Sequence, residues 1–281
     1  MSWASLLLGL ASLTTAASLQ QVTTEFGPNP TNVGFYIYVP DTLVSKPAIL
    51  VNPHWCHGTA QAAYAGSLYA ATWANTHAWE GLTHDGGGDS LGIVSMVRWT
   101  IKKYNADASR VFVTGVSSGG MMTNLLVGAY PDVFAAGSAF AGVPFECYAY
   151  PGNNSGKAIV EAAYPGYNGW RPKFQTFYGP VDETVDYVNF GEQMKQWTSV
   201  LGLSEMPTKA TANTPVNGWT KYDYRTERRF EAFSAAGHQH GRSDELGENH
   251  SYYHQDHVNH KGGRDDDGCG RWADFVGAVW R

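Results

Sequence analysis

A serine flanked by glycines constrains this chain more than any other short segment does. The pattern is GVSSG from Gly115 to Gly119, with the apolar run Val111–Thr114 before it and the helix-like segment Met121–Val127 after it. A strand that turns sharply into a helix leaves no room for side chains two positions from the serine, and the turn lifts the hydroxyl out of the sheet. The pattern predicts a strand, a tight turn and a helix, with Ser117 as candidate nucleophile; an ordinary glycine-rich turn is the alternative.

A nucleophilic serine needs a base and a residue that orients the base. The segment Lys173–Tyr178 is predicted to be a strand, and Asp182 follows its end as the preferred orienting residue. Glu183 and Asp186 are nearby alternatives. A role in a local Asx turn is another explanation for Asp182.

Two histidines follow a later predicted strand, Arg229–Phe233, at positions His238 and His240. Imidazole titrates near neutral pH, so either ring could accept the proton of Ser117 and return it to the leaving group. A serine, an aspartate and a histidine then follow separate strands in the chain order of an α/β-hydrolase.

Strands and helices are predicted to alternate along the rest of the chain, which favours an α/β fold with a mostly parallel sheet. At 281 residues and 43% hydrophobic content, the chain can bury a sizeable core. The further predicted strands are Phe35–Val39, Ala48–Val51 and Ala135–Ala139, and the predicted amphipathic helices are Ser90–Tyr104 and Val188–Leu201.

Four motifs occur in a fixed order: Asn52–Thr59 (NPHWCHGT), Leu82–Ser90 (LTHDGGGDS), Val113–Thr123 (VTGVSSGGMMT) and Tyr164–Tyr167 (YPGY). Together they resemble the fungal acetylxylan esterases of carbohydrate esterase family 1, which share an α/β-hydrolase fold with feruloyl esterases and polyhydroxybutyrate depolymerases. The resemblance implies a three-layer sandwich and a secreted enzyme that removes acetyl groups from xylan without a cofactor. A feruloyl esterase is the alternative enzyme. Outside catalysis, the alternatives are a disabled esterase that only binds glycan and a histidine-rich metal-binding protein.

The resemblance also assigns roles to particular residues. It implies that His240, rather than His238, is the base, and that the backbone N–H groups of Cys56 and Ser118 form the oxyanion hole. Such donors stabilise charge that develops only in the tetrahedral intermediate. From the residues themselves, we select Trp170 for contact with glycan because aromatic faces stack on sugar rings, although packing is the alternative for any single tryptophan.

The chain departs from this family in two internal contractions. Between Tyr69 and Leu82 the relatives carry a further strand, so the resemblance implies a sheet that lacks one family strand. The second contraction lies between Lys157 and Ala158. In relatives, the cysteines matching Cys56 and Cys147 pair within the two absent segments. These cysteines and Cys269 are therefore expected either as buried thiols or in a new bridge.

Residues 1–17 resemble a secretory signal, with the apolar core Leu6–Leu13 followed by small residues. Asn153 and Asn249 begin Asn-x-Ser sequons, which predicts glycosylation of a secreted protein. The net charge of −6 and the absence of a basic patch argue against nucleic-acid binding. The apolar core of the signal is too short to span a bilayer, and no membrane segment is predicted elsewhere. We expect a monomer whose partner is acetylated polysaccharide.

The esterase domain is predicted over residues 18–240, followed by an atypical tail, 241–281, rich in histidine, aspartate and glycine. In this tail His250, His254, His257 and His260 recur at spacings of four, three and three. On a helix they would share one face and could bind zinc or copper. The nearby aspartates and glycines favour a solvated segment instead, so no metal site is predicted.

Overall fold

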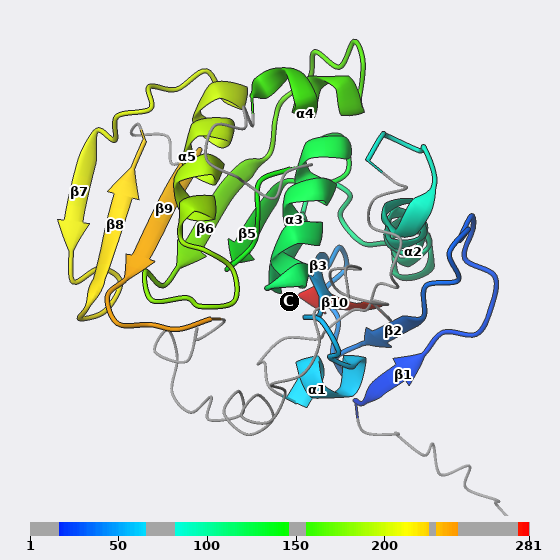
Figure 1. Cartoon of the computed structure of the whole chain (residues 1–281). Helices are drawn as coiled ribbons and strands as arrows, with labels where there is room; N and C mark the ends of the chain where they lie inside the picture. The colour runs from blue at the N-terminus through cyan, green and yellow to red at the C-terminus, as the bar shows by residue number, and fades with distance from the viewer. Residues whose placement is uncertain (1–16, 66–81, 146–155, 225–228, 241–274, 281) are drawn as a thin grey trace, which may run out of the picture.

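The computed structural model describes residues 17–65, 82–145, 156–224, 229–240 and 275–280 (Figure 1). Within these residues the strands form one sheet of ten, in the order β1-β2-β10-β3-β4-β5-β6-β9-β8-β7. The strands are β1 Leu19–Gln21, β2 Phe35–Tyr38, β3 Ala48–Pro53, β4 Val111–Val116, β5 Ala136–Phe140, β6 Lys173–Tyr178, β7 Lys209–Ala212, β8 Trp219–Asp223, β9 Phe230–Ala235 and β10 Phe275–Trp280.

The centre of the sheet is parallel. Strands β3, β4, β5, β6 and β9 run in one direction, whereas β1, β7, β8 and β10 pair antiparallel with neighbouring strands. The predicted α/β fold with a mostly parallel sheet is therefore confirmed. The carboxyl ends of β3, β4, β6 and β9 meet at one edge of the sheet, which is where ligands usually bind in such folds.

One face of the sheet carries most of the helices (Figure 1). The register places Val113, Gly137 and Phe174 side by side on this face, because directly paired residues project to the same side. The Phe174 ring stacks on Trp197, with centroids 4.4 Å apart. The helices are α1 Ala60–Ala65, α2 Gly88–Tyr104, α3 Ser118–Ala129, α4 Lys157–Ala163 and α5 Val188–Val200.

The opposite face bears a second apolar cluster. Tyr38 projects to this side, and its ring lies 5.4 Å from that of Tyr64 in α1, so α1 adds the second helical layer. Farther along the sheet, Phe177 stacks on Phe233 with centroids 4.4 Å apart. The predicted three-layer arrangement is thus present. In the described part of the chain, α1 is the helix that packs on this second face of the sheet.

Strand β10 lies between β2 and β3, parallel to β2 and antiparallel to β3. In the described sheet, β2 pairs only with β1 and β10, so β10 joins the first two strands to the rest. We predicted a tail outside the domain and a sheet short of one strand. The expected gap, between Tyr69 and Leu82, falls in residues 66–81, which lie outside the described residues. The end of the tail pairs with the sheet and occupies the edge of β3 that β4 leaves open.

Several predicted features lie outside the described residues. They are the apolar core of the signal segment, both sequon asparagines (Asn153 and Asn249), Cys147, Cys269 and the four tail histidines. In the ranges that are described, no helix has the length and apolar character needed to cross a membrane.

Candidate active site

Ser117 sits at a strained turn between β4 and α3. Its backbone has φ 56° and ψ −120°, a conformation that residues with a side chain rarely adopt. Its N–H donates a hydrogen bond to the carbonyl oxygen of Phe140 at 2.8 Å, which ties the turn to the end of β5. The strand, sharp turn and helix predicted from the sequence are all present.

The flanking glycines are required by contacts across this turn. A Cβ atom on Gly115 would lie 2.4 Å from the carbonyl carbon of Gly119, and one on Gly119 would lie 2.0 Å from the carbonyl oxygen of Pro53. Both positions therefore exclude any side chain. The second contact also places the end of β3, and His54 just after it, against the start of α3.

Asp182 lies just beyond β6 with its carboxylate fully buried. The Oδ1 atom accepts hydrogen bonds from the backbone N–H groups of Thr184 and Val185, both at 2.9 Å. The Asx turn considered as an alternative is thus present, and it fixes the carboxylate so that Oδ2 points away from the turn. Oδ2 lies 2.7 Å from Nδ1 of His240.

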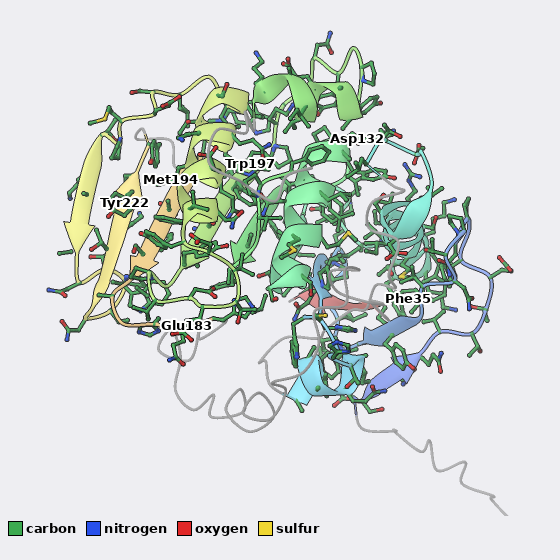
Figure 2. The ribbon with its side chains drawn as sticks, in the orientation of Figure 1. Phe35, Asp132, Glu183, Met194, Trp197 and Tyr222 are labelled. Carbon is green, nitrogen blue, oxygen red and sulfur yellow. The ribbon has the colours of Figure 1, made fainter. Side chains whose placement is uncertain are left out.

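The two competing carboxylates lie elsewhere. Asp186 accepts a hydrogen bond from the N–H of Val188 at 2.8 Å, at the start of α5. Glu183 is exposed on the loop after β6 (Figure 2). In the described structure, therefore, Asp182 is the member of this acidic group that contacts a histidine.

His240 bridges Ser117 and Asp182. Its Nε2 atom lies 2.9 Å from the Ser117 Oγ, on the opposite side of the ring from the Asp182 contact. Because an ionised carboxylate only accepts hydrogen bonds, Nδ1 carries the proton and Nε2 is left to accept the hydroxyl proton. The three residues form one continuous chain of hydrogen bonds.

The base loop packs directly on the acid loop. A Cβ atom on Gly179 would lie 1.9 Å from the carbonyl oxygen of His238, so only glycine fits there. The His238 ring itself lies 5.4 Å from the ring of Trp219. The structure thus brings His240, and not His238, to Ser117.

The oxyanion-hole residues lie on the two segments that meet at Gly119. Ser118 is the first residue of α3, and N–H groups in a first turn have no acceptor within the helix. Cys56 lies on the loop after β3 and carries a half-buried thiol. The role of their N–H groups as oxyanion donors stays a prediction.

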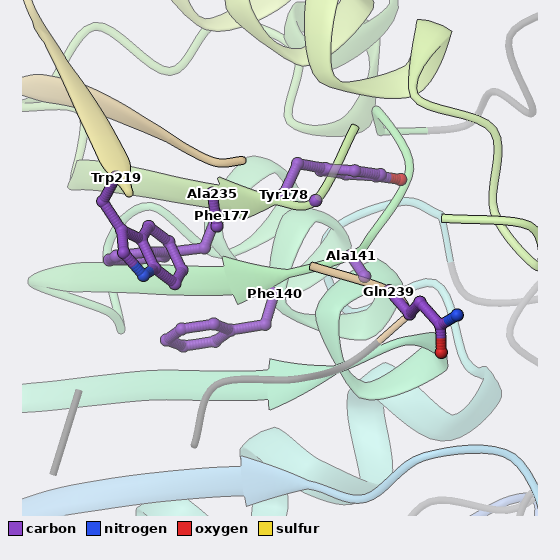
Figure 3. A pocket seen from close by; sticks show the side chains of 8 residues that line it. Phe140, Ala141, Phe177, Tyr178, Trp219, Ala235 and Gln239 are labelled. Atoms are coloured by element: carbon purple, nitrogen blue, oxygen red, sulfur yellow. The ribbon is translucent and has the colours of Figure 1, made fainter. Parts of the chain in front are cut away.

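A small aromatic-lined pocket lies beside the base loop. Figure 3 shows the rings of Phe140, Phe177 and Trp219 on one side of it and Gln239, which precedes His240, on the other. Phe140 and Phe177 stack with centroids 4.3 Å apart. This pocket could not be predicted from the sequence, because its residues come from four separate strands and the loops that follow them.

Trp170 lies far from Ser117. It precedes β6, whereas Asp182 follows β6, so the two residues are at opposite ends of that strand. Six residues of strand span about 20 Å. The structure therefore does not bring Trp170 together with Ser117, His240 and Asp182, and its predicted glycan contact cannot be at the sugar that is attacked.

A model of the prolyl oligopeptidase family of peptidases matches residues 60–150. This segment includes Ser117 and ends before Asp182. The match therefore covers the nucleophile region of an α/β-hydrolase but not the segments of Asp182 and His240. Relatives that align with most of the chain are more informative about its family.

Acetylxylan esterase A from Emericella nidulans is 46% identical over 245 residues, which cover 74% of this chain and 80% of the relative. Feruloyl esterase B from Talaromyces stipitatus is 42% identical over 79% of this chain and 72% of its own length. Among solved structures, an acetyl xylan esterase from Aspergillus awamori is 38% identical, with a TM-score of 0.71 over 79% of this chain and 94% of that one. The chain belongs to the acetylxylan esterase family of α/β-hydrolases.

Proposed function

We propose that this protein is a serine carboxylesterase that removes acetyl groups from acetylated xylan, with Ser117 as nucleophile, His240 as base and Asp182 as the residue that orients the base. The observation that carries the proposal is the continuous hydrogen-bond chain from Ser117 Oγ through His240 to Asp182, with contacts of 2.9 and 2.7 Å. The substrate class comes from the acetylxylan esterases to which the chain is similar.

In the first half of the reaction, Ser117 Oγ attacks the acetyl carbonyl carbon while its proton moves to Nε2 of His240. The carbonyl oxygen becomes an oxyanion, which the N–H groups of Cys56 and Ser118 stabilise. The intermediate then expels the sugar oxygen, which takes the proton from His240 and leaves as a hydroxyl. An acetyl ester of Ser117 remains.

In the second half, water replaces the sugar. His240 removes a proton from the water as it attacks the acetyl carbonyl, and it returns that proton to Ser117 Oγ when acetate leaves. Each half-reaction restores the charge on His240. No cofactor enters these steps.

Replacing Asp182 by asparagine is expected to lower kcat for an acetyl ester by about 10⁴-fold. The amide would favour a His240 tautomer in which Nε2 carries the proton and no longer accepts one from Ser117. Steady-state kinetics on 4-nitrophenyl acetate measures the effect. Asp186→Asn is the matched control, because Asp186 is exposed and binds only backbone at α5; comparable losses in both variants would contradict the assignment.

Feruloyl ester hydrolysis is the second candidate. The similarity to a feruloyl esterase favours it. The two acyl groups differ in size and in aromatic character, so a direct comparison of substrates separates the candidates.

We expect acetate release from acetylated xylan, with kcat/KM for 4-nitrophenyl acetate exceeding that for 4-nitrophenyl ferulate by about tenfold or more. The two esters share a leaving group, so the ratio reports the acyl preference, and a factor of ten corresponds to about 1.4 kcal/mol. Chromatographic detection of acetate and ferulate from plant xylan gives the polymer result. A preference for ferulate would favour the second candidate. If neither ester is cleaved, the protein is a non-catalytic binder.

We also propose that the protein acts outside the cell as a monomer. Cleavage of residues 1–17 and glycosylation at Asn153 and Asn249 suit an enzyme whose polymeric substrate cannot enter the cell. Intact-mass analysis of the protein secreted from a fungal host should show both the loss of residues 1–17 and the added glycan mass.

A further inference from the structure

Trp170 is an exposed tryptophan with 65% of its surface accessible. In the described part of the chain, the other exposed large apolar side chains are Val44, Val181 and Met206, and none of them is aromatic. Single exposed apolar residues are common on protein surfaces, so exposure alone does not mark a site. What distinguishes Trp170 is that the exposed group is an aromatic ring on a loop held by specific contacts.

The loop that carries Trp170 is held in place by side-chain hydrogen bonds. The Tyr167 hydroxyl donates to the carbonyl oxygen of Trp170 at 2.9 Å, and Arg171 donates to the carbonyl oxygen of Gly128 at the end of α3 at 3.1 Å. The backbone of Trp170 is fixed, which lowers the entropy lost when a ligand binds its ring.

Arg229 covers one face of the indole. Its Cζ atom lies 4.1 Å from the ring centroid, a cation–π contact between the residue before β9 and the loop before β6. Because this face is covered, the exposed surface of Trp170 lies on the other face and the edges. The indole is thus a flat, braced and solvent-facing surface, which we call the Trp170 platform.

We propose that the Trp170 platform is a surface binding site for the pyranose rings of xylan, separate from the active site. The apolar C–H face of a sugar ring packs on an aromatic face, whereas its hydroxyls stay hydrated at the edges. The platform lies at the amino ends of β6 and β9, and Ser117, His240 and Asp182 lie at the carboxyl ends. It can therefore hold polymer without blocking hydrolysis.

The identity of the sugar polymer rests on the proposed function, and native gel electrophoresis through soluble xylan tests the platform. Trp170→Ala is expected to weaken xylan binding about fivefold to tenfold, the range expected for loss of one aromatic stacking contact. Trp170→Phe should restore part of the binding. Hydrolysis of 4-nitrophenyl acetate should be unchanged in both variants, because the platform lies at the opposite end of the strands from Ser117.

Met206→Ala is the matched control, since it removes a side chain that is 76% exposed but has no ring. Wild-type xylan retardation in Trp170→Ala, or equal weakening in Met206→Ala, would overturn the platform. Absence of ester hydrolysis in the wild-type protein would instead contradict the proposed function. Thermal unfolding of each variant checks that the loop change leaves the fold intact, and a loss of binding caused by unfolding would appear as a lower Tm.

Discussion

Replacing Ser117 by alanine is expected to lower kcat for 4-nitrophenyl acetate by about 10⁴- to 10⁶-fold, while the protein stays folded. The hydroxyl is the atom that forms the acetyl ester, and in the described structure no other side chain shares its contact with His240 Nε2. Alanine keeps the Cβ atom of serine, so the substitution neither adds nor removes a steric clash at this turn. Stability should therefore remain near that of the wild type, which circular dichroism and thermal unfolding measure.

Variants of the two histidines test which of them is the base. His240→Ala should lose about as much activity as Ser117→Ala, and the double variant should lose little more, since residues that act as a unit are not additive. His238→Ala is the control two positions away, where the ring lies near Trp219 and the backbone packs on Gly179. A greater loss in His238→Ala than in His240→Ala would reverse the assignment of the base.

Deleting residues 275–281 is expected to lower the melting temperature by about 10 °C or more, or to prevent soluble expression. Strand β10 pairs through Phe275–Trp280 with β3 and connects β2 to the sheet. Each lost backbone hydrogen bond costs about 1 kcal/mol, and each kcal/mol shifts Tm by about 2 to 4 °C in a protein of this size. Activity should fall as well, because β3 supports the loop that carries Cys56.

Two further variants separate pairing from mere shortening. Removing only residue 281 should leave Tm unchanged. Gly277→Pro should destabilise nearly as much as the deletion, because Gly277 pairs with Ile37 and Val51 and proline cannot donate a ladder hydrogen bond. Differential scanning calorimetry gives all three values. A truncated protein that melts at the wild-type temperature would mean that β10 does not complete this sheet.

The central strands were predictable because their signal is local. Buried apolar runs placed β2 to β6 and β9 to within two residues at each end, and the helical spacing of α2 and α5 was similarly clear. The β7 and β8 hairpin was missed. Its strands, Lys209–Ala212 and Trp219–Asp223, are short and largely polar, and their pairing depends on the edge that β9 offers.

Strand β10 was missed although Phe275–Trp280 is an apolar run of strand length. The tail before it is polar and rich in glycine, and its partners β2 and β3 lie more than 200 positions earlier, so its place in the sheet could not be predicted. The order of Ser117, Asp182 and His240 was predictable for the opposite reason, since each follows a strand that the sequence marks clearly. Trp170 could also be selected from the sequence, as a candidate contact for glycan. Its distance from Ser117 was not predicted, because that distance depends on which end of β6 Trp170 adjoins.

The most direct test of the account is to locate the covalent label left by an organophosphonate ester inhibitor. Such a reagent phosphonylates an activated serine hydroxyl. Peptide mass spectrometry should find one label per chain, on Ser117, with loss of esterase activity in proportion to labelling. The same reagent should leave Ser117→Ala unlabelled. Inactivation with the label on another residue, or full activity after Ser117 is labelled, would contradict the assignment of Ser117 as the nucleophile.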